Sequence, residues 1–167
     1  MQNTRLKNND MNTSTIEQRI AEIARDAGLS YMCETWPRAN LRFDKFRRQK
    51  DGTVTNDTGQ QLPALLFVQP ISGGLDFTPT GTLKDSPQCL LAFADAMPLD
   101  FTGEQAQEIA ERLKGIAADF VSRMNRSGYF EIIEGRVPYK VSFDRLDANL
   151  CIFTITPEVV ATVGTCY

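Results

Sequence analysis

The chain has 167 residues, of which 42% are hydrophobic and 23% charged, with a formal net charge of −3. These values are typical of one globular domain and exclude a disordered chain. No apolar run approaches the roughly 18 residues needed to cross a bilayer, so we expect no membrane association. The polar start lacks the apolar core of a signal peptide, and we expect nothing to direct export.

Histidine is absent from the chain and its cysteines are dispersed. Without histidine there is no Ser-His or Cys-His nucleophile pair, and the usual zinc ligand is missing. Cys33, Cys89, Cys151 and Cys166 form no C-x-x-C pair, so reduced thiols in a cytosolic setting are expected. We therefore expect no enzyme activity, no cofactor and no bound metal.

The N-terminal region divides into a tail and a helix. Residues 1–12 are polar and Asn-rich, and they are expected to form a flexible tail before a single domain over residues 13–167. Thr13, Ser14 and Thr15 are N-cap candidates for a short helix that begins at Ile16 and ends near Gly28.

An extended region is predicted next. Residues 31–35 alternate in polarity, and Trp36 followed by Pro37 interrupts the run. Residues 41–46 again fit an extended pattern, and residues 64–68 form a short, wholly apolar strand. We therefore predict that residues 41–68 form a hairpin arm of two antiparallel strands joined by a long loop.

Residues 86–130 are predicted to organise the fold. Residues 89–94 are typical of a buried strand, and Thr102 with Gln105 forms a capping-box pattern at the start of a long helix. Apolar residues recur behind this cap at helical spacing. Gly128 suits the position just after the helix.

The remaining segments complete an α+β fold. Residues 80–87 are predicted to be a loop, and further strands are expected over residues 129–133, 138–143, 150–156 and 159–163. The expected architecture is an antiparallel or mixed sheet of about five to six strands. One long and one short helix pack on this sheet, and the hairpin arm extends from it.

Basic charge is concentrated near the N-terminus. Residues 1–50 hold ten Lys and Arg against six Asp and Glu, and residues 51–167 hold eight against fifteen. Part of the basic charge forms a stripe in the predicted arm, interleaved with aromatic residues: Arg42, Phe43, Lys45, Phe46, Arg47 and Arg48. Such a stripe could bind nucleic acid, contact another protein or be a solvated strand face. Because the chain as a whole is acidic, we favour a protein contact.

Four aspartates and two apolar runs are further candidates. Asp95, Asp100, Asp144 and Asp147 could converge on a cation such as Mg²⁺, but residues 144–149 more plausibly form a polar turn. The apolar pairs Phe67–Val68 and Val159–Val160 lie near expected sheet edges. Either they are covered within the chain or they pair with neighbouring copies.

The order of these segments resembles the tail completion proteins (tail terminator, or neck, proteins) of tailed phages, particularly those in prophages of gut Bacteroidetes. The matching stretches are L-P-A-L-L-F-V-Q-P over residues 62–70, D-A-M-P-L-D-F over residues 95–101, residues 114–124, and D-R-L-D-A-N-L over residues 144–150. The resemblance covers roughly residues 15–165, and its motifs are structural rather than chemical.

The resemblance implies a virion structural protein assembled in the bacterial host cytoplasm. Such proteins form a homo-oligomeric ring, commonly a hexamer, that ends tail-tube polymerisation and joins the tail to the head. The implied partners are the chain itself, the tail tube protein and a head-side connector or portal-associated protein, with contact to genomic DNA possible in the lumen. The alternative is a nucleic-acid-binding accessory domain that uses the basic stripe over residues 42–50.

Overall fold

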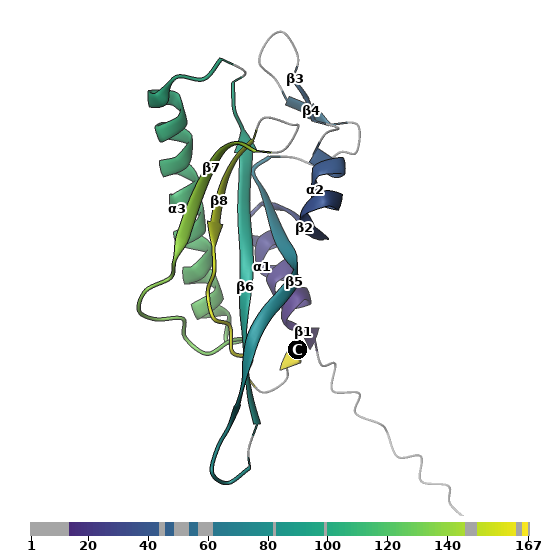
Figure 1. Ribbon diagram of the computed structural model, residues 1–167, viewed down its shortest axis with the longest axis vertical. Helices are drawn as coiled ribbons and strands as arrows, with labels where there is room; N and C mark the ends of the chain where they lie inside the picture. Colours follow the sequence, from purple (N-terminus) through teal and green to yellow (C-terminus); the bar gives the residue numbers. More distant parts are fainter. Residues whose placement is uncertain are drawn as a thin grey trace, which may run out of the picture.

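A five-stranded mixed sheet forms the centre of the computed structural model (Figure 1). Its spatial order is β2 (Ser30–Thr35), β5 (Ala64–Phe77), β6 (Leu83–Ala96), β8 (Leu150–Ile155) and β7 (Tyr139–Arg145). β2 runs parallel to β5, and the other neighbours are antiparallel. The structure describes residues 14–43, 46–48, 54–56, 62–81, 83–98, 100–145, 150–162 and 165–166. The expected α+β class with a mixed sheet is confirmed.

Two small strand pairs accompany the main sheet. β1 (Ser14–Thr15) pairs in parallel with β9 (Thr165–Cys166), and β3 (Phe46–Arg48) pairs antiparallel with β4 (Val54–Asn56).

Helices α1 (Ile16–Asp26) and α3 (Gly103–Ser127) cover one face of the sheet. Both helices begin with a capping box, in which Thr15 pairs with Gln18 and Thr102 with Gln105. These reciprocal bonds satisfy backbone donors that the first turn would otherwise leave without partners. α3 ends at Gly128, which adopts a left-handed conformation with φ of +73°. The short first helix and the long central helix are thus confirmed.

The main core lies between these two helices and the sheet. α3 contributes Leu113 and Phe120, which are fully buried, and the Phe120 ring meets the edge of Phe93 from β6 at 5.6 Å between centroids. α1 adds Ile20 to the same cluster. Removing this apolar surface from water is the main favourable term in holding the layers together.

A third helix, α2 (Trp36–Phe43), replaces the extended structure predicted for residues 41–43, whereas Phe46 does lie in a strand, β3. Pro37 does not break the chain here, because proline is compatible with the first turn of a helix. Ala39 and Phe43 lie one helical turn apart and are both fully buried on the second face of the sheet. That face forms a smaller core with Met32, Leu66 and other residues of the sheet.

The hairpin predicted over residues 41–68 is also wrong in its pairing. Residues 64–68 belong to β5, which pairs with β2 and β6 rather than with residues 41–46. β5 and β6 instead form one long hairpin that continues below the body of the molecule (Figure 1). The loop predicted over residues 80–87 is a strand from Leu83 onward, because it completes this hairpin.

The predictions for the C-terminal region are partly confirmed. Strands β7 and β8 match the predicted segments 138–143 and 150–156. Residues 129–133 are not a strand; Phe130 makes only an isolated antiparallel bridge with Ala161. Asn125 on α3 explains this, because its side chain bonds both the N–H and the C=O of Ile133 and satisfies them without a partner strand. The strand expected over residues 159–163 is not formed by residues 159–162, where Ala161 makes only this bridge, and residue 163 lies outside the described residues.

Candidate assembly surface

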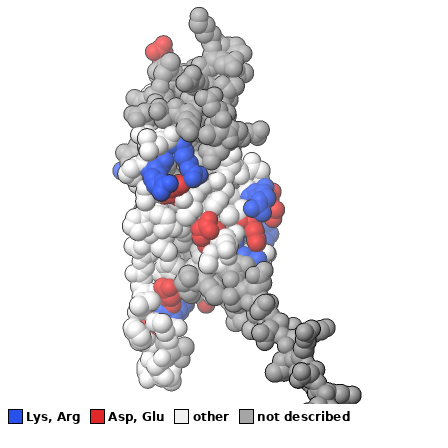
Figure 2. Space-filling view, turned by 90° about the vertical axis from the view of Figure 1, so that its right-hand side faces the viewer, with Lys and Arg blue, Asp and Glu red and all other residues white. Residues whose placement is uncertain are grey.

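The outer half of the β5–β6 hairpin, residues 70–87, protrudes from the body and is called the arm below (Figure 1). β5 is buried from Ala64 to Val68 and exposed from Pro70 to its end. At about 3.3 Å per residue, the exposed part of β5 reaches roughly 25 Å from the body. Figure 2 shows the arm, at the bottom of the view, as a mostly uncharged protrusion.

One face of the arm is apolar. Residues directly opposite in an antiparallel pair lie on the same face, and Phe77 is opposite Leu83 while Leu75 is opposite Asp85. The side chains of Leu75, Phe77 and Leu83 are 60%, 72% and 53% exposed. Three large apolar residues therefore share one exposed face near the tip.

The other face of the arm is polar and has partners within the chain. The hydroxyl of Ser86 donates to Asp76 at 3.3 Å, and Lys84 forms an ion pair with Glu131 at 3.3 Å. Glu131 lies in the segment that follows α3, so this pair links the arm to the body. The polar face therefore points toward the molecule's own side chains, and the apolar face is the one available to another protein.

The two strands of the arm lie close together at Gly73. A Cβ atom at this position would lie 2.8 Å from the Cα of Pro87 and 3.0 Å from the carbonyl oxygen of Ser86. Both contacts are with backbone, which cannot rotate away as a side chain can. Glycine at position 73 is therefore required for the strands to pair as they do.

Four residues predicted to lie at an interface are instead in the core. Phe43, Phe67, Val68 and Val159 are at most 3% exposed. Of the two alternatives left open for the apolar runs, coverage within the chain is the one observed. Their side chains already contact the sheet or the helices, so they are not available to a neighbouring copy in this structure. Val160, at the limit of burial, is covered in the same way.

The described part of the basic stripe is engaged within the chain. Arg42 and Arg38, both on α2, form ion pairs with Glu34 at 2.7 Å and 3.4 Å. Phe43 is buried beneath the helix, so it cannot stack on a base. Lys45 and the side chains of Phe46, Arg47 and Arg48 lie outside the described residues.

The arm lies outside the hairpin predicted over residues 41–68, although the sequence contains a signal for it. Leu75 and Phe77 alternate with polar residues, as expected for a strand with two different faces. Gly81, with φ of +81°, lies in the turn that precedes Leu83. Glycine-containing turns between alternating segments are typical of hairpins.

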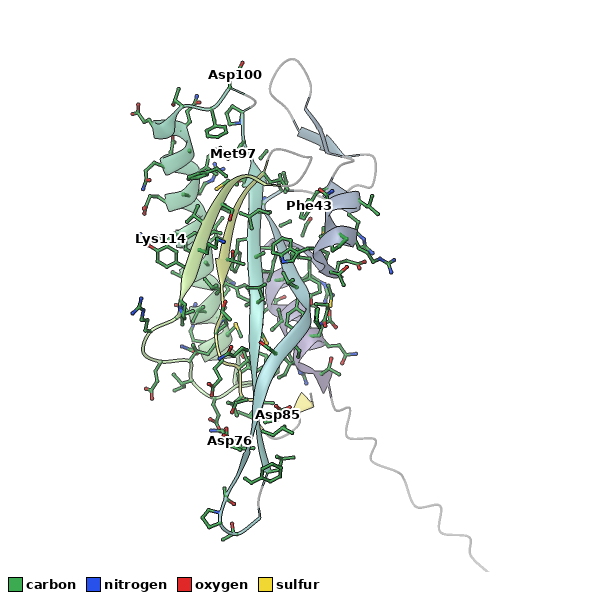
Figure 3. All side chains as sticks on the ribbon, viewed as in Figure 1. Phe43, Asp76, Asp85, Met97, Asp100 and Lys114 are labelled. Atoms are coloured by element: carbon green, nitrogen blue, oxygen red, sulfur yellow. The ribbon has the colours of Figure 1, made fainter. Side chains whose placement is uncertain are left out.

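The candidate carboxylate cluster is not assembled by the described residues. Asp95 accepts a bond from the Ala96 N–H at 2.8 Å and forms an ion pair with Arg112 on α3. Asp100 is exposed at the start of the α3 segment (Figure 3). The side chains of Asp144 and Asp147 lie outside the described residues. Across the described part of the chain, no three His, Cys, Asp or Glu side chains lie close enough to hold a metal ion.

The titratable groups with altered pKa values are buried. The hydroxyl of Tyr31 donates to Glu17 at 2.7 Å, and burial together with this carboxylate raises the Tyr31 pKa well above its usual range. Burial also raises the pKa of Cys33, and it raises the pKa of Cys89 to about 12 and that of Cys151 to about 11. These three thiols therefore stay protonated, the form that reacts poorly.

No protein-family model matches the chain, and a search of curated proteins finds no match. Among the described residues, no helix is both long and apolar enough to cross a membrane.

Proposed function

We propose that this protein is a virion structural subunit that forms a homo-oligomeric ring at the head-proximal end of a phage tail. In this role it stops polymerisation of the tail tube and joins the tail to the head connector. The single observation that carries the assembly role is the arm with its exposed apolar face. Leu75, Phe77 and Leu83 are large apolar side chains displayed on a β-ribbon, a surface that proteins ordinarily cover with a partner.

A ring is the assembly that the asymmetry of the molecule favours. The arm protrudes from one end of the body (Figure 1). Binding of such a protrusion to a different surface of the next copy is a heterologous contact, and heterologous contacts give closed rings when the rotation between subunits permits. The two open edges of the sheet, β2 and β7, are likewise unlike each other.

The assignment to a phage tail rests on the resemblance in the sequence motifs. Residues 62–70 form the entry to β5, residues 95–101 connect β6 to α3, and residues 114–124 belong to α3. In the connecting motif, Asp95 pairs with Arg112 and Met97 is fully buried. These residues hold β6 and α3 together, so this motif has a structural role in the fold.

The proposal is tested by measuring assembly directly. Size-exclusion chromatography with light scattering should give a mass of several chains, each of 18.7 kDa, and micrographs should show rings. Tail tubes grown in its presence should be shorter and carry a ring at one end. A protein that is strictly monomeric and also fails to assemble onto tail tubes would contradict the proposal.

Nucleic-acid binding by the basic stripe is the other function that the sequence suggests. It predicts salt-dependent DNA binding that disappears when Arg47 and Arg48 become Glu. The described members of the stripe do not favour it, because Arg42 is paired with Glu34 and Phe43 is buried. Absence of DNA binding at low salt would remove this alternative.

A further inference from the structure

We infer that the apolar face of the arm binds, in the next copy of this chain, to a groove between α3 and β7. The inference rests on the proposed function and specifies the contact that would build the ring. The arm and the groove are both on this chain but on different parts of its surface, so each copy would donate one arm and accept another.

The groove has the chemistry that the arm requires. It has a volume of about 290 Å³ and is lined by apolar side chains, with one lysine: Lys114, Ala117, Ala118, Val121, Val137, Tyr139, Phe153 and Ile155. Phe153 and Ile155 of β8 are buried and form its floor. Ala117 and Ala118 leave room on the helix side, because alanine side chains do not reach the strand opposite. Transfer of an apolar ring such as that of Phe77 from water into such a site has a favourable free energy.

The charges of the two surfaces are complementary. Asp85 lies on the apolar face of the arm, opposite Leu75, and among the described residues it has no ion-pair partner. Lys114 lies at the groove and is 48% exposed, and it forms an ion pair with Glu111 on the same helix at 3.2 Å. Placing Phe77 in the groove would bring a carboxylate toward an ammonium group, which favours one orientation of the arm.

The arm cannot fill the groove of its own copy in this structure. Figure 3 places Lys114 on α3, well away from Asp76 and Asp85 on the arm. The tip of the arm continues downward, away from the body (Figure 1). The match between arm and groove can therefore be made only between copies.

A second groove, on the opposite face of the sheet, has a similar size and a different lining. It has a volume of about 310 Å³ between α2 and β7, and its lining combines five apolar or aromatic residues with Lys140, Ser142, Thr154 and Thr156. An apolar tip would leave these polar groups without water or hydrogen-bond partners, which is unfavourable. The α3–β7 groove is thus the better acceptor, and the α2-side groove provides a control.

The experiment uses two variants of the full chain that disable opposite sides of the contact. Phe77→Glu places a charge on the apolar face of the arm and leaves the groove intact. Ala118→Trp fills the groove from an exposed helix position and leaves the arm intact. Each variant alone should lose every species larger than one chain in light scattering. An equimolar mixture should form a species of two chains, since only one productive contact remains.

The controls change the same elements on other faces. Ser72→Glu adds a charge to the polar face of the arm, and Ser142→Trp fills the α2-side groove; both should assemble as the wild type does. All four positions are at least partly solvent-accessible, so we expect every variant to fold. Circular dichroism and thermal unfolding check this.

The outcomes separate the contact from the ring. If Phe77→Glu or Ala118→Trp still forms wild-type rings, the arm-to-groove contact is wrong and the ring proposal stands. If both variants are monomeric and their mixture yields no two-chain species, the arm and the groove do not bind each other. If the wild type is itself monomeric at all concentrations and on tail tubes, both proposals fail.

Discussion

At the scale of single residues, the same side-chain type has opposite roles depending on its position. Phe93 is fully buried and contacts Phe120, whereas Phe77 is 72% exposed on the arm. Sequence reasoning placed functional aromatics in the stripe at Phe43, which is a core residue. Hydrophobicity alone cannot separate these cases, because burial depends on which elements pack against each position.

Truncation of the two phenylalanines should therefore have different consequences. Phe93→Ala should lower the free energy of unfolding by about 3–5 kcal/mol, because it leaves a cavity in the core. Phe77→Ala should change it by less than about 0.5 kcal/mol when measured on dilute, monomeric protein. Urea unfolding monitored by circular dichroism measures both. A large loss of monomer stability for Phe77→Ala would show that the arm packs on the body.

The buried thiols predict how stability depends on pH. The pKa values of Cys89 and Cys151 are about 12 and about 11 in the folded chain, against 9.0 for a free thiol. The folded state keeps these protons while the unfolded state releases them above pH 9. Stability should therefore be unaffected by these groups below pH 9 and fall as the pH rises further, by up to about 1.4 kcal/mol per pH unit for each thiol.

Substituting Cys89 isolates this effect. In Cys89→Ala, the loss of unfolding free energy between pH 7.5 and pH 10 should be smaller than in the wild type by about 1 kcal/mol. Tyr31 also keeps its proton in the folded chain and remains in both proteins, so it cancels in the comparison. Urea titrations at the two pH values give the difference. Equal pH dependence in the two proteins would refute the assigned burial of the Cys89 thiol.

At the scale of elements, the sequence predicts α1, α3, β7 and β8 well because their signals are local. The capping boxes at Thr15 and Thr102 and the left-handed Gly128 are set by residues within one turn of each helix end. The strand partners of β5 are set by contacts distant in the chain, and local patterns therefore predict a different hairpin, over residues 41–68. α2 was missed because its apolar face shows only Ala39 and Phe43, too few to reveal a helical period.

Adjacent glycines test the arm as an element. In Gly73→Ala the added Cβ would lie 2.8 Å from the Cα of Pro87, so the substitution should force the two strands apart. We therefore expect the amides of the arm to lose protection from hydrogen exchange. Gly74→Ala is the matched control, since a Cβ there would have no neighbour within 4 Å. Gly73→Ala should also lower global stability, because Pro87 is buried and its carbonyl accepts from the N–H of the core residue Val159 at 2.8 Å. Gly74→Ala should leave global stability unchanged. Equal exchange in both variants would show that the ribbon tolerates a side chain at position 73.

At the scale of the whole molecule, the body and the arm have separate tasks. The body buries two cores, one on each face of the sheet, and holds the α3–β7 groove open. The arm carries exposed apolar surface that contributes nothing to either core. Such a division is expected of a subunit that is stable alone and gains a further interface on assembly.

Removal of the arm tests this central claim most directly. Residues 75–85 can be replaced by Asn-Gly, which suits a two-residue turn between the opposed Gly74 and Ser86. Light scattering over a range of concentrations should then give a folded monomer, while the wild type gives a ring of defined mass. A shortened protein that assembles to the same mass as the wild type would contradict the account.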